Sequence, residues 1–241
     1  MRRLFAIGEA LIDFIPHVTN SELKDVEQFS RQVGGAPCNV AATVSKLGGQ
    51  SEMVTQLGQD AFGDIIVETI ERIGVGVDYI QRTNKANTAL AFVSLKEDGQ
   101  RDFSFYRKPS ADMLYDPSYI EDIEVTNGTI VFDPNVRLPL WEDPEACRQA
   151  ILEFIPKANV VKVSDEELEF ITGIKDETKA IQSLFKGNVV VVIYTKGPKG
   201  AQAFTKNKFT IEHQGYKVKA IDTTGAGDAF IGAVISRILT S

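Results

Sequence analysis

A run of nine residues near the C-terminus combines a glycine-rich turn with a carboxylate. It reads Asp222-Thr223-Thr224-Gly225-Ala226-Gly227-Asp228-Ala229-Phe230, and an apolar stretch that predicts a helix continues to Leu239. A glycine-rich turn that opens a helix directs backbone N–H groups and the positive end of the helix dipole at one point, which suits an anion. Asp228 would repel a bound phosphate, but it could take the proton from a hydroxyl that attacks one. The alternative is an ordinary helix start with a stabilising acid in its first turn.

Two other glycine patterns that bind phosphate are missing from the sequence. No Gly-x-x-x-x-Gly-Lys-Ser/Thr run occurs, and Gly74-Val75-Gly76 lacks the third glycine of a dinucleotide-binding turn. The turn before Asp228 is therefore the best phosphate candidate.

Polar residues that could hold a sugar lie near the N-terminus. Gly34-Gly35 precedes a predicted helix that carries Asn39, so backbone and amide groups could approach a ligand there. A simple loop before a helix is the alternative. Glu9 and Asp13 follow the first predicted strand, at the sheet edge where ligands bind in open parallel sheets. They are equally well read as two solvated loop acids.

Two later strands are also followed by charged residues. Arg137 lies in Asp133-Pro134-Asn135-Val136-Arg137, and its planar fork suits a phosphate, although a solvated loop arginine is the alternative. Ser164-Asp165-Glu166-Glu167 leaves the next strand, and its acids could hold Mg²⁺ through water. A capped helix with acids in its first turn explains that segment at least as well.

The composition excludes several classes of function. The chain has 241 residues, 43% of them hydrophobic and 24% charged, with a net charge of −7. These values indicate a globular protein and argue against nucleic acid or an anionic membrane as the main partner. Cys38 and Cys147 are the only cysteines, which fits a reducing cytoplasm. The only histidines are His17 and His213, which argues against a His/Cys zinc site.

Predicted strands alternate with predicted helices along the chain; the predicted strands include Thr129–Asp133 and Lys208–Glu212, and a turn is predicted at residues 97–99. This order is typical of a mostly parallel sheet with helices on both faces, in which ligands bind at the carboxyl ends of the strands. Two segments, near residues 15–33 and 88–107, alternate like hairpins and fit that pattern poorly. They are predicted to form a small β-flap, or lid, beside the main sheet.

Taken together, these segments resemble the ribokinase-like (PfkB) carbohydrate kinases over nearly the whole chain. Gly34-Gly35 resembles the N-terminal signature of that family, and Asp222–Asp228 resembles the highly specific C-terminal one. Thr195-Lys196-Gly197-Pro198-Lys199-Gly200 resembles the nucleotide loop, and Ser164–Glu167 stands where the family has Asn-x-x-Glu, with serine replacing asparagine. Three further stretches resemble bacterial fructokinases: Gly8–Pro16, Phe105–Asp112 and Asp133–Trp141.

The resemblance implies a ribokinase-like three-layer α/β/α sandwich with a mostly parallel central sheet and a small β-flap. It implies ATP-dependent phosphorylation of a sugar, D-fructose first of all, with Mg²⁺ and with K⁺ as a further candidate cofactor. Asp228 would be the catalytic base, with Gly225, Ala226 and Gly227 facing the transferring phosphoryl group. The remaining implied roles are sugar binding by Asp13, Gly34, Gly35, Asn39 and Arg107; nucleotide binding by Arg137, Ser164, Thr195, Gly197 and Gly200; Mg²⁺ organisation through water by Glu167; and monovalent-cation binding by Asp222 and Thr224.

The chain departs from the family in two places. A strand, a loop and a helix that family members carry have no counterpart near residues 124–127, and the family continues well past Ser241. We therefore expect a single kinase domain over residues 1–241 that lacks an internal segment and the C-terminal part of the fold. Two alternatives stay open: a kinase of the same fold acting on 2-keto-3-deoxygluconate, ribose or a nucleoside, and a non-catalytic descendant that binds a sugar or a partner chain. The exposed strand edges of a lid would also favour a homodimer.

Overall fold

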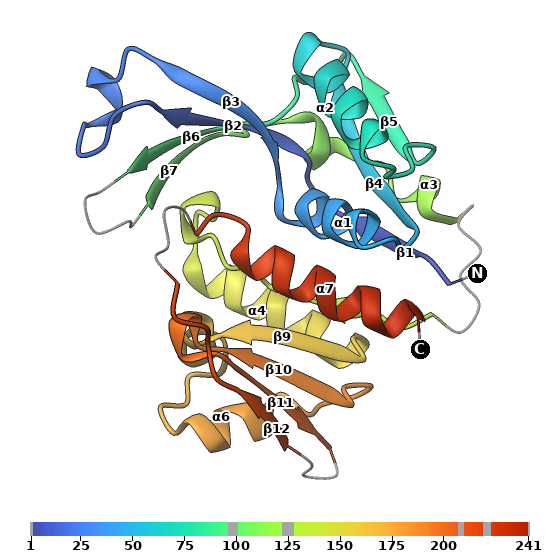
Figure 1. The fold of residues 1–241 in the computed structure, drawn as a ribbon, viewed down its shortest axis with the longest axis vertical. Helices are drawn as coiled ribbons and strands as arrows, with labels where there is room; N and C mark the ends of the chain where they lie inside the picture. The colour runs from blue at the N-terminus through green and yellow to red at the C-terminus, as the bar shows by residue number, and fades with distance from the viewer. Residues whose placement is uncertain (1, 96–100, 122–127, 207–209, 219–222, 241) are drawn as a thin grey trace. The chain divides into compact units, whose positions relative to one another are not determined.

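The structure, a computed structural model, describes residues 2–95, 101–121, 128–206, 210–218 and 223–240. It divides into two compact units, one of residues 1–123 and 220–241 and the other of residues 124–219 (Figure 1). Each unit is described by itself below. In the described ranges, no helix combines the length and the hydropathy needed to cross a membrane.

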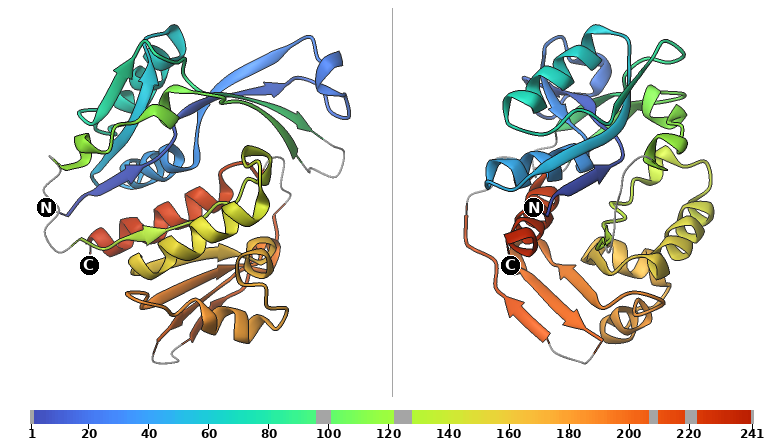
Figure 2. Two further views of the ribbon diagram at one scale, coloured as in Figure 1. Left: turned by 180° about the vertical axis from the view of Figure 1, so that it is seen from behind. Right: turned by 90° about the vertical axis from the view of Figure 1, so that its right-hand side faces the viewer.

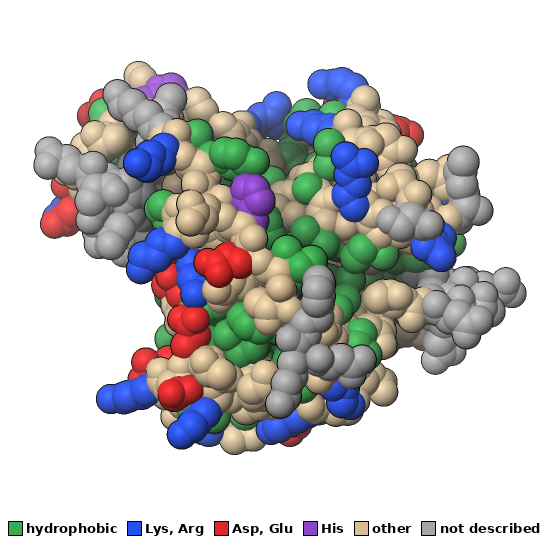
Figure 3. Space-filling model, turned by 60° about the horizontal axis from the view of Figure 1, so that its bottom comes forward, with side chains coloured by type: hydrophobic (Ala, Val, Ile, Leu, Met, Phe, Trp, Pro, Cys, Tyr) green, Lys and Arg blue, Asp and Glu red, His purple; other side chains and the backbone are tan. Residues whose placement is uncertain are grey.

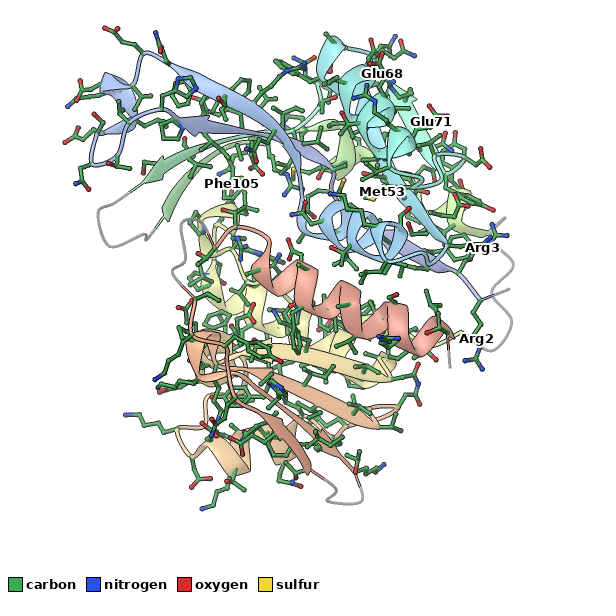
Figure 4. All side chains as sticks on the ribbon, viewed as in Figure 1. Arg2, Arg3, Met53, Glu68, Glu71 and Phe105 are labelled. Atoms are coloured by element: carbon green, nitrogen blue, oxygen red, sulfur yellow. The ribbon has the colours of Figure 1, made fainter. Side chains whose placement is uncertain are left out.

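The first unit contains a parallel three-stranded sheet in the order β1-β4-β5. Its strands are β1 (Leu4–Ile7), β4 (Ser51–Gly58) and β5 (Ile80–Thr83), and its two longer N-terminal helices are α1 (Ala36–Lys46) and α2 (Ala61–Arg72). Helix α2 begins at Asp60, whose carboxylate accepts hydrogen bonds from the N–H groups of Phe62 and Gly63 at 3.1 and 2.9 Å. It buries Ile66 and Ile70 against the core that includes Met53 of β4, while Glu68 and Glu71 lie on its exposed face (Figure 4).

A second sheet of the first unit has the order β3-β2-β6-β7. Its strands are β2 (Leu11–Pro16), β3 (Phe29–Gly34), β6 (Leu90–Leu95) and β7 (Arg101–Tyr106). One face carries a cluster of aromatic rings, in which Phe14 and Phe92 stack at 4.7 Å. Phe105 of β7 packs against Leu11, Ala89 and Ala91 (Figure 4). These strands fall in the segments expected to form a lid, although β2 begins earlier than expected; whether they act as a lid stays a prediction.

Helix α7 (Ala226–Thr240) lies alongside α1, as both views in Figure 2 show. The close approach depends on Gly232, because a Cβ atom there would lie 2.7 Å from Cβ of Thr43 and 3.2 Å from the carbonyl oxygen of Val40. The unit also contains the one-turn helix α3 (Ser118–Glu121). Since α1 carries Asn39 and α7 carries Asp228, this contact brings together residues from opposite ends of the chain.

The second unit contains a five-stranded sheet in the order β12-β11-β10-β9-β8, parallel from β8 to β10 and antiparallel beyond. Its strands are β8 (Val131–Phe132), β9 (Val160–Ser164), β10 (Val191–Thr195), β11 (Ala201–Thr205) and β12 (Thr210–His213), and its helices are α4 (Pro144–Phe154), α5 (Asp165–Thr172) and α6 (Glu177–Ser183). Alternate residues of the two central strands, among them Val161 and Val192, pack with residues of all three helices in one core. The sheet thus presents the carboxyl ends of β8, β9 and β10 at one edge.

Most expected helices and strands are present, and the differences have local causes. The strand expected over Thr129–Asp133 is reduced to β8, and the expected strand Lys208–Glu212 begins at Thr210 in the described range. Asp13 does not lie in a loop after β1 but inside β2, where it pairs with Gln32 of β3. Strand β5 and helix α6 were not predicted, because both are short and rich in polar residues. The turn expected at residues 97–99 lies outside the described residues.

Candidate active site

Asp228 lies in the first turn of α7, directly after the glycine turn. Gly225 has φ of 70°, a left-handed conformation that favours glycine. The Ala226 N–H donates to the Thr223 carbonyl at 3.2 Å and so closes the turn. Asn39 of α1 donates from Nδ2 to Oδ2 of Asp228 at 2.9 Å. The candidate base is therefore oriented by an amide 189 positions away in the chain.

A pocket of about 240 Å³ lies beside this pair and is open to solvent on the first unit. Five predicted residues line it, namely Asp13, Gly34, Asn39, Thr224 and Gly225. Gly34 is needed next to Asp13, because a Cβ atom there would lie 2.0 Å from Oδ2 of Asp13. The structure thus brings most of the predicted sugar-side residues to one concave surface.

Five further lining residues were not predicted: Gln32, Val33, Ala42, Thr43 and Lys46. Three of them are three, four and seven positions after Asn39 on α1, and this spacing puts them on the same helix face. Helical periodicity could therefore have found them. Gln32 could not have been found in this way, because only the pairing of β2 with β3 places it opposite Asp13.

Gly35 shapes the turn before α1 but is not among the pocket-lining residues. Its φ is 99°, and a Cβ atom would lie 2.6 Å from the carbonyl oxygen of Glu9. Oε1 of Glu9 accepts a hydrogen bond from the next N–H, that of Ala36, at 3.1 Å. Burial raises the pKa of the Glu9 carboxyl, and the positive charge of Arg107 opposes this rise. Glu9 therefore stabilises the turn through its hydrogen bond with the Ala36 N–H.

Cys38 lies among these charges without contributing a nucleophile. Burial, followed by the negative charges of Glu9 and Asp228, raises the pKa of the Cys38 thiol to about 12. The thiolate is the reactive form of cysteine, so Cys38 stays protonated near neutral pH and acts as a small apolar core residue.

Arg107 forms an ion pair with Asp112, and the two side chains are only 15% and 7% exposed. The Ser110 hydroxyl donates to Oδ1 of Asp112 at 2.5 Å. Nε of Arg107 is buried, with no hydrogen-bond partner among the described residues. Arg107 is not among the residues that line the pocket, so its contact with the sugar stays a prediction.

In the second unit, Ser164 and Thr195 end neighbouring parallel strands and are direct partners in the register of β9 and β10. Gly197 and Gly200 follow with φ of 50° and 102°. A Cβ atom at Gly200 would lie 2.0 Å from the carbonyl oxygen of His213, so the turn requires glycine there. The structure thus gathers the predicted nucleotide-loop residues at the carboxyl edge of this sheet.

Glu167 and Arg137 also lie at this edge. Glu167 is 8% exposed and accepts hydrogen bonds from Ser164 and from the Val136 N–H. Arg137 is exposed, and its guanidinium contacts carbonyl oxygens of its own segment. Lys162 of β9 pairs with Asp133 at 3.0 Å in a mostly buried ion pair, a feature that the sequence did not reveal.

The metal predictions fit the structure only in part. No group of three or more His, Cys, Asp or Glu side chains able to hold a metal ion occurs within the described residues. Mg²⁺ in kinases is held largely by phosphates and water, so a dedicated protein site is not required. Thr224 lines the pocket, whereas Asp222 lies outside the described residues, so their monovalent-cation site stays a prediction.

Comparison with known proteins identifies the fold. The fructokinase of Xylella fastidiosa with bound ATP has a TM-score of 0.87 and 31% identity, covering 99% of this chain and 82% of that one. A fructose-, ADP- and calcium-bound fructokinase of Vibrio cholerae has a TM-score of 0.88 and 29% identity, covering 100% and 85%. A putative ribokinase II of E. coli in complex with ATP and Mg²⁺, 24% identical with a TM-score of 0.87 and coverage of 100% and 87%, shows the fold alone. The expected ribokinase-like α/β fold is confirmed.

Sequence comparison identifies the family. The probable fructokinase-4 of Arabidopsis thaliana is 39% identical over 270 residues, which cover 98% of this chain and 82% of that protein. The family model of the pfkB carbohydrate kinases matches in two pieces, residues 1–125 and 119–241. The chain therefore belongs to the pfkB family of carbohydrate kinases.

Proposed function

We propose that this carbohydrate kinase transfers the γ-phosphate of ATP to D-fructose and forms fructose 6-phosphate. The observation that carries the proposal is Asp228, held by Asn39 at 2.9 Å, beside a pocket lined by Asp13. Relatives and structural neighbours named as fructokinases support the choice of sugar.

The proposed reaction uses these residues in a simple order. Asp13 and Asn39 orient the sugar, and Asp228 takes the proton from the attacking hydroxyl. The hydroxyl oxygen then bonds to the γ-phosphorus while the bond to the bridging oxygen breaks and ADP leaves. The N–H groups of the glycine turn and the α7 dipole stabilise the transferring group. Positioning and charge neutralisation supply most of the catalysis in such transfers.

The nucleotide side of the proposal rests on the second unit. Arg137, Ser164, Thr195, Gly197 and Gly200 are its candidate nucleotide contacts. Mg²⁺ that arrives with ATP would neutralise phosphate charge. The family resemblance implies that Glu167 organises this Mg²⁺ through water. K⁺ at Asp222 and Thr224 remains part of the proposal.

Coupled assays with purified protein test this function. ATP and Mg²⁺ are supplied with fructose, ribose, 2-keto-3-deoxygluconate or adenosine, and kcat/KM is compared. We expect fructose to give the highest value. A higher value for any other acceptor would reject the fructose assignment, and no turnover with any acceptor would favour a sugar-binding protein without catalysis.

We also propose that the chain is one kinase domain shortened near residues 124–127. In support, the family model matches as two overlapping pieces, and the alignment of 270 residues with the Arabidopsis relative is longer than this chain of 241. A peptide map across residues 119–130 tests this: we expect peptides that run continuously from residue 123 to residue 128 as in this sequence, and additional residues there would contradict the proposal.

Finally, we propose that this kinase is cytoplasmic and does not bind nucleic acid. We also propose that it forms a homodimer through the sheet β3-β2-β6-β7. The terminal strands β3 and β7 of that sheet support pairing. On the face in Figure 3, Lys and Arg side chains are scattered, in keeping with a net charge of −7. Light scattering after size exclusion checks the pairing, because a monomeric mass would contradict it.

A further inference from the structure

Glu167 makes more hydrogen bonds than helix capping requires. Its Oε2 accepts from the Ser164 N–H at 2.9 Å and from the Ser164 hydroxyl at 2.8 Å. Its Oε1 accepts from the Val136 N–H at 2.7 Å. A capping box needs only contacts with the N-cap residue, here Ser164. The bond to Val136 therefore needs a separate explanation.

This bond joins the ends of two strands. Val136 follows β8, whereas Glu167 follows β9, and they are 31 positions apart. The residue before Val136, Asn135, has φ of 43°, which is uncommon for a residue other than glycine. A hydrogen bond to an ionised carboxylate is stronger than one between neutral groups. The buried carboxylate therefore holds this segment in a conformation that it would not favour alone.

The neighbouring Arg137 depends on the same segment. Its Nη1 lies 3.4 Å from the carbonyl oxygen of Asn135 and 3.1 Å from that of Val136. The guanidinium thus contacts the same backbone segment that is hydrogen-bonded to Glu167. A rotation of the Val136 peptide would move the guanidinium with it.

We propose that Glu167 is a positioning residue whose carboxylate sets the Val136–Arg137 segment so that Arg137 meets the nucleotide phosphates. This inference rests on the proposed function, which assigns Arg137 to the nucleotide. It differs from the expectation that Glu167 organises Mg²⁺ through water. A carboxylate has about four acceptor sites, and bonds from Val136 and Ser164 occupy three of them.

Two substitutions separate the two roles. Glu167→Gln removes the charge but keeps a carbonyl oxygen that can accept from Val136. Glu167→Asp keeps the charge but shortens the side chain by one methylene, so it can still cap Ser164 and no longer reaches Val136. If Glu167 acts by positioning the segment, Glu167→Asp should weaken nucleotide binding more than Glu167→Gln does. If Glu167 acts through its charge on Mg²⁺, Glu167→Gln should be the more damaging substitution.

The first measurement is binding of a non-hydrolysable ATP analogue in EDTA, which needs neither metal nor turnover. We expect Glu167→Asp to raise Kd about tenfold, the size of one lost bond to a charged group, and Glu167→Gln to raise it less. Glu166 is exposed and precedes Glu167 in the chain, so Glu166→Asp is the matched control and should leave Kd for the analogue unchanged. Amide exchange at Val136 should accelerate in Glu167→Asp and stay slow in Glu167→Gln.

A double-mutant cycle with Arg137→Ala tests whether the effect passes through Arg137. We expect Glu167→Asp to have little further effect on Kd once Arg137 is removed. Additive losses would overturn the inference, as would a raised Mg²⁺ requirement in Glu167→Gln with unchanged Kd for the analogue. If the wild type binds the analogue but phosphorylates no sugar, only the proposed function fails. If it binds no nucleotide, both fail.

Discussion

At the scale of single residues, the site depends on how one carboxylate is oriented. Asp228 receives a hydrogen bond from Asn39 on one oxygen, and its position in the first turn of α7 places it beside a concentration of backbone N–H groups. The amide fixes the direction of the carboxylate without neutralising it. This arrangement suits a base that must meet a sugar hydroxyl.

Asp228→Asn should nearly abolish turnover and leave substrate binding close to that of the wild type. Asparagine keeps the size and hydrogen-bonding capacity but cannot accept the proton, and a general base usually contributes about 10²–10⁴-fold. The loss should appear in kcat with KM little changed. Steady-state kinetics and direct binding of both substrates measure it. The control is Asp64→Asn, which alters a first-turn acid of α2. If kcat of Asp228→Asn falls by less than about tenfold, the catalytic role is rejected.

Gly34→Ala should weaken fructose binding by displacing Asp13. The new Cβ would lie 2.0 Å from Oδ2 of Asp13, and each hydrogen bond lost from a charged group weakens binding by roughly 1.5–3 kcal/mol. KM for fructose should rise at least about tenfold while KM for ATP stays constant. Gly76→Ala is a matched control, because its Cβ would lie 1.9 Å from a carboxylate oxygen of Glu52, which does not line the pocket. Equal changes in the two KM values would contradict a sugar-facing Asp13.

At the scale of elements, the contact of α1 with α7 decides whether the site forms. The two helices approach closely at Gly232 and Thr43, which lie four positions after Asp228 and four positions after Asn39 respectively. This contact sets the distance between the Asn39 amide and the Asp228 carboxylate. The packing of Gly232 against Thr43 therefore controls the geometry of a polar pair one helical turn away.

Gly232→Ala should lower both stability and kcat. Alanine favours helix formation, but the added methyl would lie 2.7 Å from Cβ of Thr43, and overpacking of this kind costs typically about 1–3 kcal/mol. Separation of the helices would weaken the Asn39–Asp228 bond. Thermal unfolding and kcat are measured beside Ala233→Ser, which adds one heavy atom to the exposed face of α7. An unchanged kcat in a destabilised Gly232→Ala protein would show that the site does not depend on this contact.

At the scale of the whole molecule, the candidate sugar and nucleotide residues lie in two different units, each with its own core. The first contains the pocket, Asp13, Asn39 and Asp228. The second contains the candidate nucleotide residues at the end of its parallel strands. Each ligand is therefore expected to stabilise a different part of the chain.

Hydrogen exchange with single ligands tests this division. Fructose alone should slow amide exchange in Gly34–Lys46 and leave Thr195–Gly200 unchanged, because ligands protect the groups that they order. An ATP analogue alone should slow exchange in Thr195–Gly200. Protection of Thr195–Gly200 by fructose alone would contradict the assignment of the two units. Helix α4, which carries none of the predicted site residues, serves as the internal reference.

The sequence alone determined the features that depend on neighbours in the chain. The glycine turn before Asp228, the start of α7, the order of most strands and helices and the turn at Gly35 follow from local backbone preferences and periodicity. The resemblance of the sequence motifs to a known family, and not these preferences, predicted the ribokinase-like fold and the carbohydrate kinase family, which the comparisons confirm.

Only the tertiary structure decided which side chains meet. It placed Asp13 inside a strand opposite Gln32, joined Asn39 to Asp228 and turned the Glu167 carboxylate toward Val136. Each of these contacts links segments far apart in the chain, and its geometry depends on strand register and helix packing. Local preferences do not specify such distances, because the same residue patterns are compatible with several registers and packings. Several candidate site residues could therefore be proposed from the sequence, whereas their contacts, and pocket residues such as Gln32, required the fold.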